Sequence, residues 1–69
     1  MREAALAEAE YKVVETSVVT DEELEQILNR VTAEGWTLDA IQFAMRDGNR
    51  RPSMAFVIFT RARPEDGAR

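Results

Sequence analysis

The 69-residue sequence contains no cysteine and no histidine. Without cysteine the chain cannot form disulfides or thiolate metal sites, which excludes a small secreted scaffold held together by disulfides. Without histidine it lacks the usual general base and the commonest metal ligand, so nucleophilic triads and histidine-based metal centres are excluded too. Its three glycines, Gly35, Gly48 and Gly67, are too far apart to form a phosphate-binding loop. We therefore predict no catalytic residue, no cofactor and no metal ligand, and we expect that the protein is not an enzyme.

Long apolar runs are also missing. No stretch approaches the ~18 apolar residues of a membrane span, and acids interrupt the first ten residues, which lack a signal-peptide core. We therefore expect a cytoplasmic protein with no membrane partner. A chain this short buries only about 60% of the surface that it exposes when unfolded. One domain, assisted by an oligomer partner, is the expected organisation.

Charge is unevenly distributed along the chain. Residues 1–34 hold three basic and nine acidic side chains, 3 − 9 = −6, whereas residues 35–69 hold six arginines and four acids, 6 − 4 = +2. Four arginines, which we expect at a hairpin and along the last strand, are candidate contacts for an anion or a nucleic acid: Arg46, Arg50, Arg51 and Arg61. The net charge of −4 weighs against a nucleic-acid partner, which stays the second hypothesis.

The clearest local signal predicts a helix over residues 21–34. Thr20 stands three residues before Glu23, which is the spacing of a capping box, and Gly35 stands where a left-handed turn would end the helix. The apolar side chains recur with helical spacing, at Leu24, Ile27, Leu28 and Val31. The acids of the first turn are explained by the helix dipole better than by a metal or base site. Trp36, directly after the glycine, is expected to cap the core rather than to stack on a ligand.

Three segments read as strands, over residues 11–19, 36–45 and 53–60. The second changes the phase of its alternation, which predicts either a bulge near Asp39 and Ala40 or a sheet whose far face is apolar over half its length. Residues 46–53 are expected to form a turn in which Pro52 stops strand pairing. The third strand is apolar on both faces, as a central strand is.

These elements predict an α+β fold of the type β-α-β-β. A right-handed crossover followed by a hairpin gives a three-stranded sheet of order 1-3-2 with one helix on one face, half of a ferredoxin-like layer. We expect this single domain to span residues 11–61, with a flexible or short helical arm over 1–10 and a disordered tail over 62–69.

One helix can cover only one face of such a sheet. We therefore predict a homo-oligomer, most simply a two-fold dimer whose sheets pack face to face or join edge to edge. The alternative is that the arm folds back as a lid through Ala5, Leu6 and Ala9. The candidate interface residues are Val14, Val18, Ile41, Phe43, Met45, Val57 and Phe59.

The chain resembles a family of short bacterial and phage proteins, domain-of-unknown-function family 4177. The resemblance covers about residues 10–61 and depends on a Tyr-Lys-Val-Val opening at 11–14, a Leu-Asn pair at Leu28 and Asn29, and a Glu-Gly-Trp turn at 34–36. It implies the same fold. Because the family has no established activity, it implies no catalytic residues. The sequence thus favours a small self-associating binding module of unknown partner, with an anion or nucleic-acid binder second and an unrecognised enzyme third.

Overall fold

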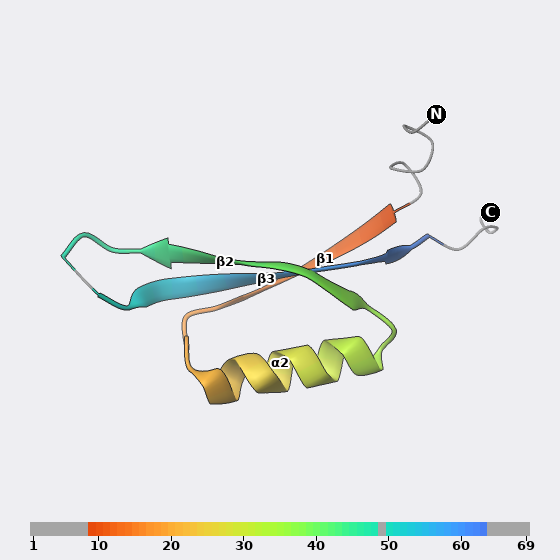
Figure 1. The fold of residues 1–69 in the computed structure, drawn as a ribbon, viewed down its shortest axis with the longest axis horizontal. Coiled ribbons are helices and arrows are strands. Elements are labelled where there is room, and N and C mark those ends of the chain that lie inside the picture. Colours follow the sequence, from red (N-terminus) through yellow and green to blue (C-terminus); the bar gives the residue numbers. More distant parts are fainter. Residues whose placement is uncertain (1–8, 49, 64–69) are drawn as a thin grey trace.

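The computed structural model describes residues 9–48 and 50–63. The elements follow one another as β1 (Ala9–Thr16), α2 (Asp21–Ala33), β2 (Thr37–Met45) and β3 (Pro52–Ala62) (Figure 1). The predicted α+β class and the β-α-β-β order are therefore confirmed. Two strands differ in length from the prediction: β1 begins earlier, at Ala9, and ends three residues sooner, at Thr16, while β3 extends to Ala62. The rest of the predicted arm and of the predicted tail, including Ala5 and Leu6 of the lid alternative, lies outside the described residues, apart from Arg63.

The strands form one sheet of order β1-β3-β2, as predicted. β3 pairs antiparallel with both neighbours, so β1 and β2 run parallel to each other on either side of it. Helix α2 lies on one face of this sheet (Figure 1). The prediction for Pro52 was wrong: this residue opens β3 and pairs with Met45. Proline is compatible with the first position of a strand.

The predicted bulge in β2 is present at Asp39. Leu38 pairs with Phe59 and Ala40 pairs with Ile58, so Asp39 is the extra residue. Side chains normally alternate between faces along a strand, and the bulge shifts that alternation by one residue. Leu38 and Ile41 consequently share one face, which accounts for the change of phase seen in the sequence.

Both ends of α2 have the signals expected from the sequence, a cap where the helix begins and a glycine after it ends. The amide of Glu23 donates a 3.2 Å hydrogen bond to Oγ1 of Thr20, which satisfies one of the free amides of the first turn. At the other end Gly35 has φ +100°, a backbone conformation that is strained for any residue with a Cβ. The amide of Trp36 then returns a hydrogen bond to the carbonyl of Val31. The chain leaving the helix is thereby directed back into the sheet.

The core lies between α2 and the sheet. Ile27 and Val31 of the helix pack against Val57 and Phe59 of β3, and all four are at most 2% exposed. Five half-buried apolar side chains surround this cluster: Val14, Leu24, Leu28, Trp36 and Ile41. The helix stripe predicted from the sequence is therefore the helix side of the core.

Candidate interaction surfaces

One face of the sheet is left without a helix by the described elements. Residues that stand opposite each other in neighbouring strands share a face. Because Val57 and Phe59 point toward α2, their neighbours Phe56 and Ile58 point away from it. The pairing then assigns a set of apolar side chains to the side away from the helix, here called the uncovered face: Tyr11, Val13, Ala40, Ala44, Met54, Phe56 and Ile58.

Exposure differs across the uncovered face. Tyr11 and Val13, on the edge strand β1, are 60% and 59% exposed. Phe56 and Ile58 are half-buried, since both neighbouring strands flank them. The polar side chains of this face are Glu15, Thr37 and Gln42 on the two outer strands and Thr60 near the end of β3. The surface thus has an apolar centre, with polar side chains toward its edges.

Most of the predicted interface residues do not lie on this face. Val57 and Phe59 are fully buried in the core of the chain itself, and Val14 and Ile41 pack against that core. Their assignment to a free surface was therefore wrong. The physical reason is the direction that α2 takes, since the helix covers the face carrying Val14 and not the one carrying Val13.

Tyr11 and Val13 were missed by sequence reasoning. Both are apolar residues two apart in a strand, so they share a face, and that alternation was the available signal. Valines occupy both neighbouring positions, Val13 and Val14, so the pattern of β1 alone does not say which face the helix covers.

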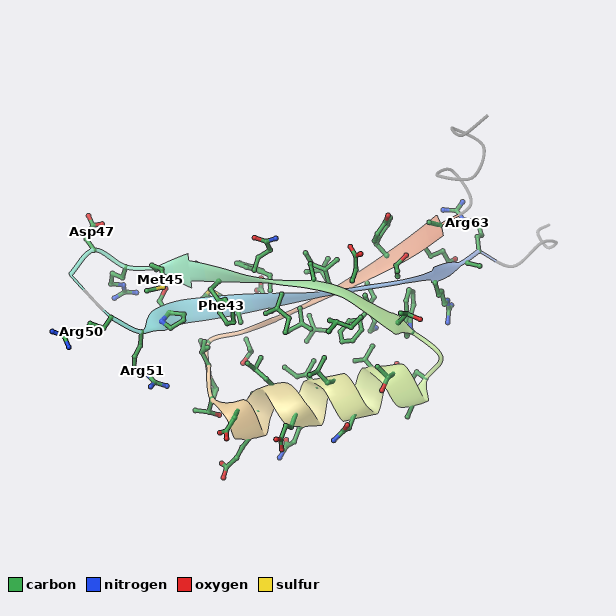
Figure 2. The ribbon with its side chains drawn as sticks, in the orientation of Figure 1. Phe43, Met45, Asp47, Arg50, Arg51 and Arg63 are labelled. Carbon is green, nitrogen blue, oxygen red and sulfur yellow. The ribbon has the colours of Figure 1, made fainter. Side chains whose placement is uncertain are left out.

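The other three predicted interface residues are exposed. Val18, Phe43 and Met45 have exposed fractions of 53%, 49% and 56%. Phe43 stands opposite Ala55, on the helix side of the sheet, and Met45 is the last residue of β2 before the turn. Figure 2 shows both on the strand that leads to the β2–β3 turn. They belong to a different surface from the uncovered face.

The arginines divide into two groups. Arg46, Arg50 and Arg51 lie at the β2–β3 turn, whereas Arg61 and Arg63 lie at the opposite end of the sheet, where Figure 2 labels Arg63. Ten residues of a strand span roughly 33 Å, so Arg51 and Arg61 cannot contact the same small ligand. The predicted set of four arginines is thus three at one end and one at the other.

Arg61 is held by structural contacts. Its Nε donates a 2.9 Å hydrogen bond to Oε1 of Glu10, and its Cζ lies 4.1 Å from the centroid of the Trp36 ring. Nζ of Lys12 lies 5.9 Å from the same centroid. Trp36 is half-buried against the core, so the expectation that it caps the core is confirmed. These contacts tie the start of β1 to the end of β3 and to the exit of the helix.

The acidic residues do not gather into a metal site in the described part of the chain. No group of three or more carboxylates between residues 9 and 63, residue 49 apart, is placed to hold a metal ion. Asp21, Glu22 and Glu23 stand in the first turn of α2, where negative charge complements the helix dipole. Their positions agree with the structural explanation.

The one helix among residues 9–48 and 50–63 is too short and too polar to cross a membrane. Comparison of the chain with family models, curated proteins and solved structures finds no significant match.

Proposed function

We propose that this protein is a self-associating interaction module, and that two copies pair through the uncovered face to form a two-fold homodimer. The observation that supports this most directly is the exposure of Tyr11 and Val13 beside the half-buried Phe56 and Ile58. Large apolar side chains of a small domain gather on one surface mainly where that surface meets a partner.

The composition of the uncovered face suits a protein interface. Interfaces place apolar side chains at the centre and polar ones at the rim. Here Phe56 and Ile58 occupy the central strand, with Val13 beside Ile58 on β1, while Glu15 and Gln42 stand on the outer strands. A buried charge without a partner would oppose pairing, and Glu15, which is exposed at the edge, can keep its contact with water.

A second copy of the chain is the proposed occupant of the face. Two sheets pack about 10 Å apart when their apolar side chains interdigitate, and a two-fold axis lets one surface serve both partners. Full burial of a large apolar side chain contributes roughly 1.5 to 3 kcal/mol. Because the single core of a chain this short is small, the dimer would supply a second apolar layer.

We further propose that this binding module has no catalytic activity and acts in the cytoplasm. The support for this proposal is the absence of histidine and cysteine from the sequence, together with the structural roles of the first-turn acids. The resemblance to domain-of-unknown-function family 4177 stays a prediction and agrees with this proposal, since it implies no active-site residues.

The test compares two valines of similar exposure. Val13 lies on the uncovered face and is 59% exposed, and Val18 lies in the loop before α2 and is 53% exposed. We expect light scattering and sedimentation velocity to give the mass of two chains for the unmodified protein and for Val18→Lys, and the mass of one chain for Val13→Lys. Val13→Lys would bring a charged side chain beside Ile58 in the apolar part of the interface, and the desolvation of that charge opposes pairing.

Two results would overturn the proposal. One is an unmodified protein that keeps the mass of a single chain at the highest concentration measured. The other is equal loss of pairing in both variants, which would place the contact elsewhere. Circular dichroism of each variant shows whether the fold is retained.

A further inference from the structure

The β2–β3 hairpin extends beyond the rest of the fold. Strand β1 pairs with β3 only from Ala55 onward, whereas β2 stays paired to β3 as far as Met45 and Pro52. Figure 1 shows the hairpin projecting past the loop between β1 and α2 and past the first turn of the helix. Residues 43–48 and 50–52 are here called the hairpin end. Its side chains can therefore reach a partner that does not approach the acidic helix.

The hairpin end is a basic part of the described surface. It carries Arg46, Arg50 and Arg51, all exposed, and one acid, Asp47, which gives 3 − 1 = +2. Over residues 9–48 and 50–63 the only ion pair joins Arg61 to Glu10, so none of these three arginines has a carboxylate partner there. Arg51 donates from Nη2 to the carbonyl of Val19 at 3.1 Å, which orients it and leaves its other donors free.

Two exposed apolar side chains accompany these arginines. Phe43 is 49% exposed and Met45 is 56% exposed. In Figure 2 both side chains lie along β2, before the turn, and Asp47, Arg50 and Arg51 lie nearer the tip of the hairpin. The surface therefore combines an aromatic ring with three arginine cations over one short stretch of chain.

We propose that the hairpin end binds single-stranded nucleic acid. Arginine guanidinium groups bind phosphates with paired hydrogen bonds, and an exposed aromatic ring offers a platform on which an unpaired base stacks. A strand lying across the flank of the hairpin contacts Phe43 with a base and the arginines with its backbone. A duplex keeps its bases stacked and hidden from Phe43, so the single strand is the better fit.

An anionic membrane fits the same surface less well. A membrane approached by the tip would first meet Asp47 and the arginines, and the apolar side chains behind the turn would stay in water. Peripheral membrane binding depends on burying apolar side chains in the interface region. The order of side chains along the hairpin therefore favours a strand that crosses its side.

The experiment measures binding of a labelled oligouridylate of about eight nucleotides to the full chain by fluorescence anisotropy, from about 50 to 200 mM salt. Three phosphate contacts predict a slope of log affinity against log salt of about −2. In the double variant Arg46→Ala/Arg50→Ala the slope should become shallower, about −0.7, because one phosphate contact remains. Arg51 is kept in this variant because it also holds the loop at Val19.

A matched control removes the same charge elsewhere. The double variant Arg30→Ala/Arg63→Ala takes one arginine from the exposed side of α2 and one from the far end of the sheet. It should bind with the slope of the unmodified protein. A second pair of variants tests the ring: Phe43→Leu should bind on the order of tenfold more weakly, and Phe43→Trp should bind at least as well as the unmodified protein.

Three outcomes would overturn the inference. They are an equal loss of slope in the two double variants, binding by Phe43→Leu as tight as that of the unmodified protein, and attachment to anionic lipid vesicles without binding to the oligouridylate. Light scattering on Arg46→Ala/Arg50→Ala should give the unmodified mass, since these residues are not on the uncovered face. A lost oligonucleotide contact is thereby separated from a lost dimer.

Discussion

The two faces of the sheet carry similar apolar side chains but have different environments. Along β3, Val57 and Phe59 are fully buried beneath α2, whereas Phe56 and Ile58, their immediate neighbours, are shielded only by the flanking strands. Apolar content alone therefore does not determine where the core of this chain lies. The side on which the helix packs determines it, and the described elements leave the second face without a helix.

The largest effect is expected when two phenylalanines of the same strand are each replaced by alanine and compared. Phe59→Ala should lower the free energy of unfolding by about 3 to 5 kcal/mol, because it leaves a cavity under the helix. A domain of this size has a total stability of roughly 3 to 10 kcal/mol, so this variant should lose a large share of its stability. Phe56→Ala should lower it by only about 1 kcal/mol at low protein concentration and should weaken pairing. Urea unfolding followed by circular dichroism, repeated over a range of protein concentrations, checks both.

Equal losses in these two variants would break the comparison, since they would mean that both faces are equally buried in one chain. A concentration-dependent loss in Phe56→Ala alone would sharpen it. That result would assign the stabilising role of Phe56 to the dimer.

A smaller effect is expected where the helix ends. Gly35 has φ +100°, and a Cβ built there meets no atom within 4 Å. Gly35→Ala should therefore cost about 1 to 2 kcal/mol of stability through backbone strain alone. Thermal unfolding of this variant measures the effect. Because the substitution affects the exit of α2, it should loosen the covered face and leave pairing of the folded chains unchanged. Unchanged stability would show that the turn adopts another conformation.

The smallest effect is expected from two threonines, Thr20 at the cap that precedes the helix and Thr32 within it. Thr20→Ala removes the hydroxyl that accepts from the Glu23 amide and should cost about 1 kcal/mol. Thr32 lies inside the helix, where its hydroxyl donates to the carbonyl of Leu28, and alanine is a better helix former. Thr32→Ala should accordingly be neutral or slightly stabilising. Denaturant midpoints of the two variants, measured side by side, should differ in this order, and the reverse order would contradict the assigned cap.

Sequence reasoning reached the elements of this fold and their order, because each has a local cause. The cap at Thr20, the glycine after the helix and the phase change at Asp39 are all readable within a few residues. The face that the helix covers has no local cause, since Val13 and Val14 are equally suited to a core and β3 is apolar on both sides. The pairing of Arg61 with Glu10 joins residues 51 positions apart, and no short sequence pattern predicts it. The residues of the candidate surfaces could therefore be identified only from the three-dimensional arrangement of the elements.

The strand order also has a consequence for how the chain folds. The neighbour of β1 in the described sheet is β3, and the paired residues are separated by 55 − 16 = 39 to 62 − 9 = 53 positions. The β2–β3 hairpin, in contrast, can close locally within microseconds. Pairing between distant segments slows folding because the chain loses entropy before the contacts form. We expect the hairpin to form first, and the first strand to join last by closing nearly the whole described chain into a loop.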